Sequence, residues 1–558
     1  MPTSAAQSTP SVSVTTVDTW LDDGAILATL HLPHDAASVG VVVCPPIGYD
    51  YTVAYRTLRY LADRIAESGI PVIRFDYPGF GDSTAPLSMD AFGQGAELAA
   101  GALRSSGCDS IVYLGLGSGA LVASLAAAGD PAPAGLVLWD PVSSGRQWMR
   151  RQRSIYSLAL GSLAEEAPDG VVEIAGAEMP QWFAEGIEAL SYDAGVASRV
   201  PTLVAVRAGK GGVVPPSLRP VQERCDVLEV TEHEESLDVS SVDSWIPAAS
   251  VNVVTGWLNS RFATDRRPLP VPLPVPVDLV YFSYEGSAVE ERLRRIGPND
   301  LFGIETRPAG GADDLPVVIL HNGSAEHRTG ATRHQVDLAR RLAVLGFRAL
   351  RVDRRGTGET GEVHSEEPKM LFAKEWLEDG ADIIADLAMP REKIGVAGMC
   401  VGSWVGLAAA SDRVAFVAAS SVSDYRVRPL PPTSKAAPVA PTKWHALRER
   451  AIAVAKRRAP YRIMLALATR GLVQFVEPSL RGALAAGTDV TILLSPRDTD
   501  IFKAHRGETA ARRLNRTLGR LTVIEHPTGD HALFSPGIRA RAIEEALAMS
   551  ARFFNSAS

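Results

Sequence analysis

The feature that most constrains this chain of 558 residues is an internal repeat. The first half contains VVVCPPIG at residues 41–48, then a helical pattern with a further apolar run, and then IVYLGLGSGALVASLAAA at residues 111–128. The second half repeats this order, with VVILHNGS at residues 317–324 and IGVAGMCVGSWVGLAAA at residues 394–410. Short apolar segments that alternate with amphipathic helices predict a mainly parallel sheet covered on both faces. We therefore expect two copies of one α/β domain.

The segment between the two copies supports this division. RFATDRRPLPVPLPVPVDL, at residues 261–279, alternates proline with apolar residues, as a stiff extended linker does. A length of 558 residues also suits two domains of about 250 residues each. We predict domains at residues 15–262 and 280–558, a linker at 263–279 and a disordered tail at 1–14. The stiff linker predicts that the two domains contact each other.

Composition narrows the range of functions. The net charge of −8 argues against a general nucleic-acid binder. Residues 111–129 are uncharged, but their β-branched start and central glycines favour a buried strand and helix, so we expect no membrane span. The four cysteines form no CxxC pair, and the histidines are not at metal-binding spacing, so no metal or cofactor is expected. The start of the chain lacks the pattern of a signal peptide, which predicts a cytoplasmic protein.

The glycines around Cys400 indicate a specific turn. The sequence GMCVG at residues 398–402 stands between an apolar strand and a helix, and it resembles the nucleophile elbow of α/β-hydrolases. Glycines are needed there because the nucleophile occupies a strained turn, where neighbouring side chains would collide. Residues 321–361 also resemble the hydrolases associated with bacterial exosortase systems. This resemblance implies two α/β-hydrolase domains, each with a mainly parallel sheet flanked by helices and with a helical lid insertion.

The resemblance also implies a catalytic triad in the second half, because these enzymes have the chain order nucleophile, acid, histidine. Cys400 occupies the elbow, Asp498 ends the run VTILLSPRD, and His531 follows the strand RLTVIEH. His531 would take the thiol proton, and Asp498 would hold the imidazole in the useful tautomer. Asp500 and Asp424 are alternative candidates for the acid.

The developing oxyanion in such an enzyme needs two backbone donors. The resemblance implies the N–H of Val401 and one from the HNGS loop, at Gly323 or Ser324. His526 falls inside a predicted strand, so we expect a structural role for it. The remaining cysteines are expected to be small buried apolar residues: Cys44, Cys108 and Cys225.

The first half lacks every member of the triad. Its elbow, GLGSG, has Gly117 in the nucleophile position, and alignment of the two halves puts Lys210 and Asp238 in place of the acid and the histidine. Pro46 stands in the oxyanion loop and has no N–H to donate. We predict a catalytically inactive copy. The alternative is an offset pair of Ser118 and His233.

A cysteine at the elbow suggests a class of reaction. Cysteine variants of this fold resemble dienelactone hydrolases, polyhydroxyalkanoate synthases and tetramate-forming cyclases, and in the latter two the acyl donor is a thioester. Thiolate attack on a thioester leaves an acyl-enzyme that still reacts with an alcohol, an amine or a carbanion. The leading hypothesis is acyl transfer through Cys400 from a thioester of coenzyme A or acyl carrier protein, as in specialised metabolite biosynthesis. Hydrolysis of an ester, lactone or thioester by the same triad, and a non-catalytic scaffold, are the alternatives.

A long insertion at about residues 425–487 is expected to form a lid that excludes water. It begins as a proline-rich loop and continues with a helical pattern that carries a basic cluster. One interpretation of this cluster is a dock for the phosphates of coenzyme A or for an acidic carrier protein. The other is an ordinary solvated helix face. The basic residues are Arg448, Arg450, Lys456, Arg457, Arg458 and Arg462.

Overall fold

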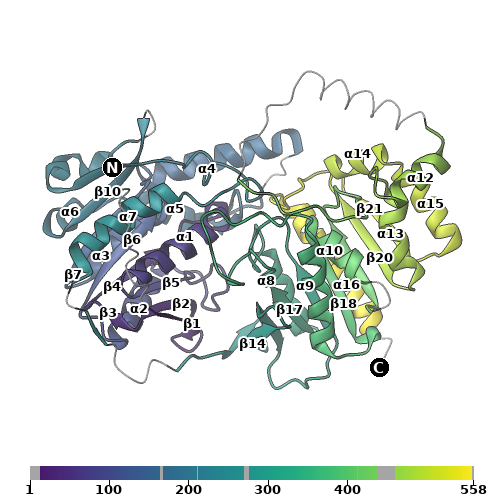
Figure 1. Ribbon diagram of the computed structural model, residues 1–558, viewed down its shortest axis with the longest axis horizontal. Helices are drawn as coiled ribbons and strands as arrows, with labels where there is room; N and C mark the ends of the chain where they lie inside the picture. Colours follow the sequence, from purple (N-terminus) through teal and green to yellow (C-terminus); the bar gives the residue numbers. More distant parts are fainter. Residues whose placement is uncertain are drawn as a thin grey trace, which may run out of the picture. The chain divides into compact units, whose positions relative to one another are not determined.

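The computed structural model of the chain describes residues 13–163, 167–209, 212–264, 266–268, 275–410, 413–435 and 459–555 (Figure 1). The chain divides into two compact units. The first unit comprises Met1–Ile155, Asp169–Phe282 and Val363–Ser365. The second unit comprises Tyr156–Pro168, Ser283–Glu362 and Glu366–Ser558.

An eight-stranded sheet forms the centre of the first unit, with the strand order β1-β2-β5-β4-β6-β7-β10-β11. The neighbours from β5 to β11 are parallel, whereas β2 pairs antiparallel with both β1 and β5. The strands of this sheet are β1 (Val14–Leu21), β2 (Ile26–Pro33), β4 (Val39–Cys44), β5 (Val72–Phe75), β6 (Ser110–Leu116), β7 (Pro133–Trp139), β10 (Thr202–Arg207) and β11 (Asp226–Val230). Two short pairs lie outside it, β3 (Asp35–Ala36) with β12 (Arg267–Pro268), and β8 (Val171–Ile174) with β9 (Ala177–Pro180).

Helices cover both faces of this sheet because its strands are apolar on both sides. The helices are α1 (Tyr49–Glu67), α2 (Ala91–Ser105), α3 (Gly119–Gly129), α4 (Gly145–Leu160), α5 (Gln181–Ala189), α6 (Ala194–Arg199) and α7 (Ala248–Phe262). Val41 and Val43 of β4 pack in one apolar cluster with α1 and α7. Val42 and Cys44 point to the other face and pack with α2, α3 and α6. This alternation is the two-residue period of a strand that is buried on both faces.

A nine-stranded sheet forms the centre of the second unit, with the order β13-β14-β15-β17-β16-β18-β19-β20-β21. The neighbours from β17 to β21 are parallel, and β15 pairs antiparallel with β14 and β17. The strands are β13 (Leu279–Tyr284), β14 (Ser287–Ile296), β15 (Leu301–Pro308), β16 (Val317–His321), β17 (Arg348–Val352), β18 (Ile394–Met399), β19 (Phe416–Ser420), β20 (Asp489–Leu494) and β21 (Leu521–Glu525).

Helices again cover both faces. They are α8 (His334–Val344), α9 (Lys374–Leu387), α10 (Val401–Ala410), α12 (Tyr461–Thr469), α13 (Val476–Ala485), α14 (Pro496–Ala504), α15 (Gly507–Thr517) and α16 (Pro536–Phe554). Val317 and Ile319 of β16 pack in one apolar cluster with α9, α13 and α15. Val318 and Leu320 pack on the opposite face with α8 and α16.

The two sheets share one topology over eight strands. β4, β5, β6, β7, β10 and β11 occupy the positions of β16, β17, β18, β19, β20 and β21, and β1 and β2 occupy those of β14 and β15. The predicted fold class, two α/β domains each with a mainly parallel sheet flanked by helices, is confirmed. In Figure 1 the eight-stranded sheet is coloured from purple to teal, and the nine-stranded sheet from teal through green to yellow.

Three predicted segments fall partly outside the described residues. Residues 1–12 of the tail are among them, and β1 already begins at Val14. Within the linker the structure describes residues 266–268, where β12 lies, and residues 275–279. Residues 436–458 of the lid are not described, and the described remainder contains α12 and α13. In the part of the chain that is described, no helix has both the length and the apolar character that a bilayer span needs.

Candidate active site

Cys400 occupies a strained turn between β18 and α10. Its φ of 50° lies in the left-handed region, which is costly for any residue with a side chain. A Cβ at Gly398 would lie 2.7 Å from backbone atoms of Gly402, and a Cβ at Gly402 would lie 2.3 Å from the carbonyl oxygen of His321. Both positions therefore need glycine, as an elbow requires. Cys400 itself is half-buried.

His531 joins Cys400 to a buried carboxylate. Its Nδ1 lies 2.7 Å from Oδ1 of Asp498, which is fully buried, and its ring also hydrogen bonds to Cys400. Burial alone would lower the pKa of His531, but the hydrogen bonds and charges of Asp498 and Cys400 raise it to about 10. The imidazole is therefore held in its protonated form beside the sulfur. The His531 side chain is 26% exposed, so solvent reaches it.

Local structure explains why these residues meet. Asp498 lies in the first turn of α14, whose N-cap is Ser495, and the Ser495 hydroxyl donates to Asp498 Oδ2 at 2.7 Å. The loop between β21 and α16 is held by Asp530, whose carboxylate accepts from the N–H groups of Ala532 and Ser535. Since β18, β20 and β21 are parallel neighbours in one sheet, the segments at their carboxyl ends converge at one edge.

The three predicted oxyanion donors lie in the two segments that meet at the elbow, the HNGS loop and the start of α10. A Cβ on Gly323 would lie 3.5 Å from Cys400 Cβ, so the HNGS loop passes directly against the elbow. Val401 is the first residue of α10 and is buried. Ser324 lies one residue further along the loop with a φ of 35°, and its carbonyl accepts from Arg354 Nη2 at 3.2 Å.

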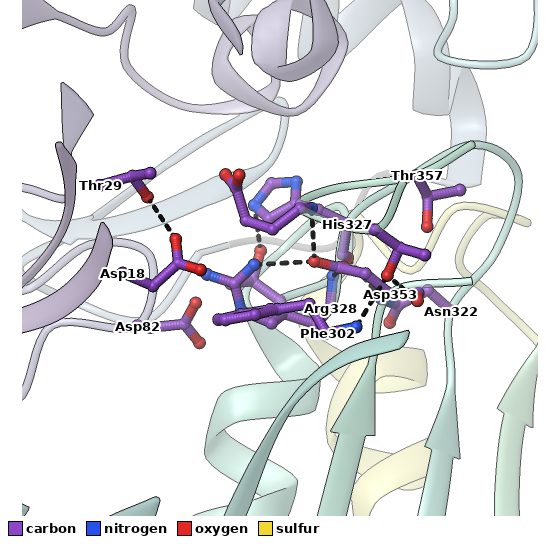
Figure 2. Close-up of polar contacts among 12 residues, drawn as sticks. Asp18, Thr29, Asp82, Phe302, Asn322, His327, Arg328, Asp353 and Thr357 are labelled. Atoms are coloured by element: carbon purple, nitrogen blue, oxygen red, sulfur yellow. Dashed lines mark hydrogen bonds and ion pairs between the residues drawn. The ribbon is translucent and has the colours of Figure 1, made fainter. Parts of the chain in front are cut away.

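A buried ion pair fixes the loop after β16, as Figure 2 shows. Asp353, directly after β17, accepts from the backbone N–H of Arg328 at 2.6 Å and from its Nη1 at 2.8 Å. The guanidinium of Arg328 also stacks over Phe302, with 4.5 Å from its Cζ to the ring centre. The Asn322 side chain donates to the carbonyl oxygen of His327 and closes the same loop. The backbone next to the sulfur is therefore rigidly supported.

Arg354 is a site residue that the sequence analysis missed. Its Nη2 donates to the carbonyl oxygens of Asn322 at 2.9 Å and Ser324 at 3.2 Å, and its guanidinium stacks over Trp376 at 4.3 Å. Burial lowers the pKa of Arg354 to about 10, against the opposing charges of Asp379, Cys400 and Glu326. The structure thus places a buried positive charge near the sulfur. The sequence gives one indication of this residue, which is that Arg354 and Arg355 directly follow the predicted strand ending at Asp353.

Among the described residues, the carboxylate that pairs with His531 is Asp498, and no hydrogen bond or ion pair joins His531 to Asp424 or Asp500. Asp424 forms an ion pair with Arg426 and accepts from Gln474 at 3.0 Å. Asp500 points to solvent from the surface of α14. His526 bonds through Nδ1 to the carbonyl oxygen of Thr528 at 2.9 Å.

The predicted basic cluster is largely outside the described residues. Arg462 is described and is exposed on α12. The members that fall outside are Arg448, Arg450, Lys456, Arg457 and Arg458. Among the residues that the structure describes, no group of three histidine, cysteine or acidic side chains could hold a metal ion.

The first unit keeps the elbow without a nucleophile. A Cβ at Gly115 would lie 2.2 Å from the carbonyl oxygen of Gly119, and a Cβ at Gly119 would lie 2.2 Å from that of Cys44. Gly117 has a φ of 60°, close to that of Cys400. The nearest atom to a Cβ at Gly117 is Cβ of Pro46, at 3.9 Å, so space for a side chain remains.

The oxyanion loop of the first unit also lacks a group that the second unit has. Cys44 and His321 are the last residues of β4 and β16 and pair with equivalent positions in the next strand. Pro46 is two residues after Cys44, and Gly323 is two residues after His321, so Pro46 and Gly323 hold equivalent positions. Proline offers no N–H at this position.

The remaining predicted positions of the first unit do not form a triad. The Ser118 hydroxyl accepts from the backbone N–H of Ile47 at 2.9 Å. His233 packs edge-on against Trp139, and burial lowers its pKa. Over the described ranges, no hydrogen bond joins Ser118 to His233, which argues against the offset pair.

Asp238, which stands in the place of the histidine, has an ordinary structural partnership. It forms ion pairs with Arg207 and, at 3.2 Å, with Arg151. Lys210 lies outside the described residues. Of the other cysteines, Cys44 and Cys108 are buried as expected, whereas Cys225 is half-buried.

No protein-family model and no curated protein sequence matches this chain. Similar solved structures include an acetyl xylan esterase from a Paenibacillus species, at 14% identity and a TM-score of 0.31, and an esterase from Pyrococcus furiosus, at 13% and 0.31. A dienelactone hydrolase from Anabaena variabilis matches at 14% identity and a TM-score of 0.25. The matches cover 49%, 47% and 50% of this chain and 89%, 96% and 99% of those proteins, respectively.

Proposed function

We propose that this chain is an α/β-hydrolase-type enzyme that cleaves a carboxylic ester or thioester through Cys400. The observation that carries the proposal is the hydrogen-bonded line from buried Asp498 through His531 to Cys400, which stands on a turn with a φ of 50°. A structural cysteine has no need of a strained turn, a protonated imidazole and a buried carboxylate together.

The reaction would proceed in two stages. The Cys400 sulfur attacks the carbonyl carbon and forms a C–S bond, while the carbonyl oxygen becomes an oxyanion near the N–H groups of Val401 and Gly323. The C–O or C–S bond to the leaving group then breaks, and His531 gives its proton to the departing oxygen or sulfur. In the second stage His531 takes a proton from water, whose oxygen attacks the acyl carbon. The C–S bond breaks, and the products are a carboxylic acid and the restored pair.

Charges around the sulfur support the first step. The interaction with Cys400 is one of the causes that raise the pKa of His531 to about 10. The buried Arg354 guanidinium experiences the same attraction to Cys400. Two positive groups therefore lie near the sulfur that attacks.

Water is the acceptor that the geometry supports best. The His531 side chain is 26% exposed and Cys400 is half-buried, so a water molecule can reach both groups. The structure thus favours hydrolysis over the acyl transfer that led among the sequence hypotheses.

Acyl transfer stays the second candidate because the nucleophile is sulfur. Exchange of one thioester for another is nearly isoenergetic, so the acyl-enzyme keeps enough energy to acylate an alcohol or an amine. The distribution of products with and without an added alcohol or amine separates the two candidates.

The direct test is intact-mass spectrometry after mixing the full chain with p-nitrophenyl acetate or with acetyl-coenzyme A. One acetyl adduct should appear, and it should be absent from Cys400→Ala. Cys225→Ala is the matched control, because Cys225 is also half-buried but has no imidazole partner among the described residues. Its adduct should equal that of the unaltered protein.

An adduct that persists in Cys400→Ala would contradict the proposal, and so would the absence of turnover and of an adduct with both acyl donors. The latter result would favour the non-catalytic scaffold.

A further inference from the structure

A cavity of about 720 Å³ lies over the inactive elbow of the first unit. It opens at the carboxyl ends of β4, β6, β7 and β10, and the α4 helix forms one of its sides. Gly117 is part of its lining, so the space that a nucleophile would enter is continuous with the cavity. A volume of this size is typical of a small-molecule site.

The lining combines an apolar wall with six charged side chains. The apolar part includes Leu116, Val142, Val206, Val213 and Leu237. The charged residues are Asp50, Asp140, Asp238, Arg150, Arg151 and Arg207.

Two of the three carboxylates are already neutralised by arginine. Arg207 holds Asp140 in a fork, with 2.7 Å from Nε to Oδ1 and 2.6 Å from Nη2 to Oδ2. The same guanidinium pairs with Asp238, which also accepts from Arg151 at 3.2 Å. These four groups form a closed network with balanced charge.

Asp50 differs from the other two carboxylates. Its Oδ2 accepts from the side chains of Gln152 at 3.0 Å and Trp148 at 3.5 Å, both of which are neutral donors. Oδ1 has no hydrogen bond, and Asp50 no ion pair, to any residue that the structure describes. The cavity is thus lined by one carboxylate oxygen, on the half-buried Asp50, that has no hydrogen-bond partner among the described residues.

We propose that the cavity of the first unit is a non-covalent binding site for a small organic amine. The ammonium group donates to Asp50 Oδ1, and the apolar body of the ligand packs against the wall that includes Leu116, Val206 and Leu237. Because Gly117 supplies no nucleophile and Pro46 no oxyanion donor, the ligand is held without reaction.

The free oxygen of Asp50 favours a cation over an anion. The donors that Asp50 has among the described residues are neutral, whereas Arg207 and Arg151 already pair with Asp140 and Asp238. Arg150, the third arginine of the lining, lies on the exposed surface of α4. An ammonium at Oδ1 gains a charge-assisted hydrogen bond where a carboxylate would meet repulsion.

The proposal has a pH signature. Burial raises the pKa of Asp50 to about 6, opposed by Arg151 and by the Trp148 hydrogen bond and reinforced by Asp238 and Asp140. Arg150 and Arg207 share the cavity lining, and His233 lies near the Arg207 network. Affinity for an amine should fall about ten-fold between pH 7.5 and pH 5, because the carboxylate is lost in this interval.

Titration calorimetry with the full chain tests the proposal with three probes of similar shape: 2-phenylethylamine, 3-phenylpropanoate and 2-phenylethanol. At pH 7.5 the amine should bind at least ten-fold more tightly than the other two. Asp50→Asn should reduce its affinity at least ten-fold, and Leu237→Trp should reduce it by filling the cavity. Cys400→Ala should leave it unchanged, which separates this site from the proposed catalytic one.

Two results would overturn the proposal. One is binding of the carboxylate as tightly as the amine, and the other is the absence of amine binding by the unaltered chain. Circular dichroism shows whether Asp50→Asn is folded. If Asp50→Asn is unfolded, the test depends on Leu237→Trp. Unchanged amine affinity in folded Leu237→Trp would then overturn the proposal.

Discussion

The two elbows of this chain have nearly the same backbone and different chemistry. Both stand at the end of a central parallel strand, both have glycines that admit no Cβ, and both have a positive φ at the middle residue, 60° at Gly117 and 50° at Cys400. In the second unit that residue is a thiol hydrogen bonded to His531. In the first unit it is a glycine beneath a cavity. The comparison teaches that the turn is kept by the fold, whereas reactivity needs the partners that converge on it.

The largest expected effect is that of removing the sulfur. Cys400→Ala should lower kcat/KM for p-nitrophenyl acetate by about 10⁴ to 10⁶, because nucleophile and base act as a unit. Initial rates and the melting temperature should be measured together. Near-normal activity in a folded Cys400→Ala variant would contradict the claim that the second elbow carries the nucleophile.

The next effect tests the buried carboxylate. Asp498→Asn should lower kcat by about 10³ to 10⁴, because the amide can no longer hold the imidazole in the required tautomer or stabilise its charge. Asp500→Asn is the matched control, since that side chain is exposed on the same helix. Equal losses in both variants would contradict the role of Asp498.

The glycines of the two elbows allow a paired experiment on stability. Gly402→Ala places a Cβ 2.3 Å from the carbonyl oxygen of His321, and Gly119→Ala places one 2.2 Å from that of Cys44. Each variant should therefore lower the free energy of unfolding of its unit by about 1–3 kcal/mol. Urea unfolding measures the loss, and only Gly402→Ala should also reduce activity. A comparable loss of activity in Gly119→Ala would show that the first elbow takes part in catalysis.

A further effect concerns the pH dependence of stability. The pKa of His531 is raised from an ordinary 6.5 to about 10, so its contribution to stability is complete below pH 6.5 and is lost as the pH rises through 10. The difference in free energy of unfolding between the unaltered chain and His531→Gln should therefore shrink between pH 6.5 and pH 10. A difference that grows over this interval would contradict the raised pKa.

Much of the fold was predictable from local pattern. The repeat, the apolar strands and the glycine-rich turns indicate two α/β units, because these features depend on period and on turn chemistry within short segments. Asp498 and His531 were predicted from the resemblance to α/β-hydrolases, and both fall after parallel strands, whose carboxyl ends meet at one edge.

Other features depend on contacts that local pattern does not contain. Arg354 is placed near Cys400 by its hydrogen bonds to the loop after β16 and by stacking on Trp376 in the first turn of α9. Asp50 Oδ1 has no partner among the described residues because Arg207 and Arg151 donate to Asp140 and Asp238 instead. Glycine at position 117 of the sequence indicates that the first elbow has no nucleophile. It does not indicate that a cavity lies over this elbow.

The most direct test of the account compares two thiols on the two elbows in one molecule. In the Gly117→Cys variant, which has room for the side chain, alkylation by iodoacetamide at pH 7 is followed for each cysteine by peptide mass spectrometry. The account predicts that Cys400 reacts at least 100-fold faster than the introduced thiol, because only Cys400 has His531 beside it. Equal rates at the two elbows would contradict it.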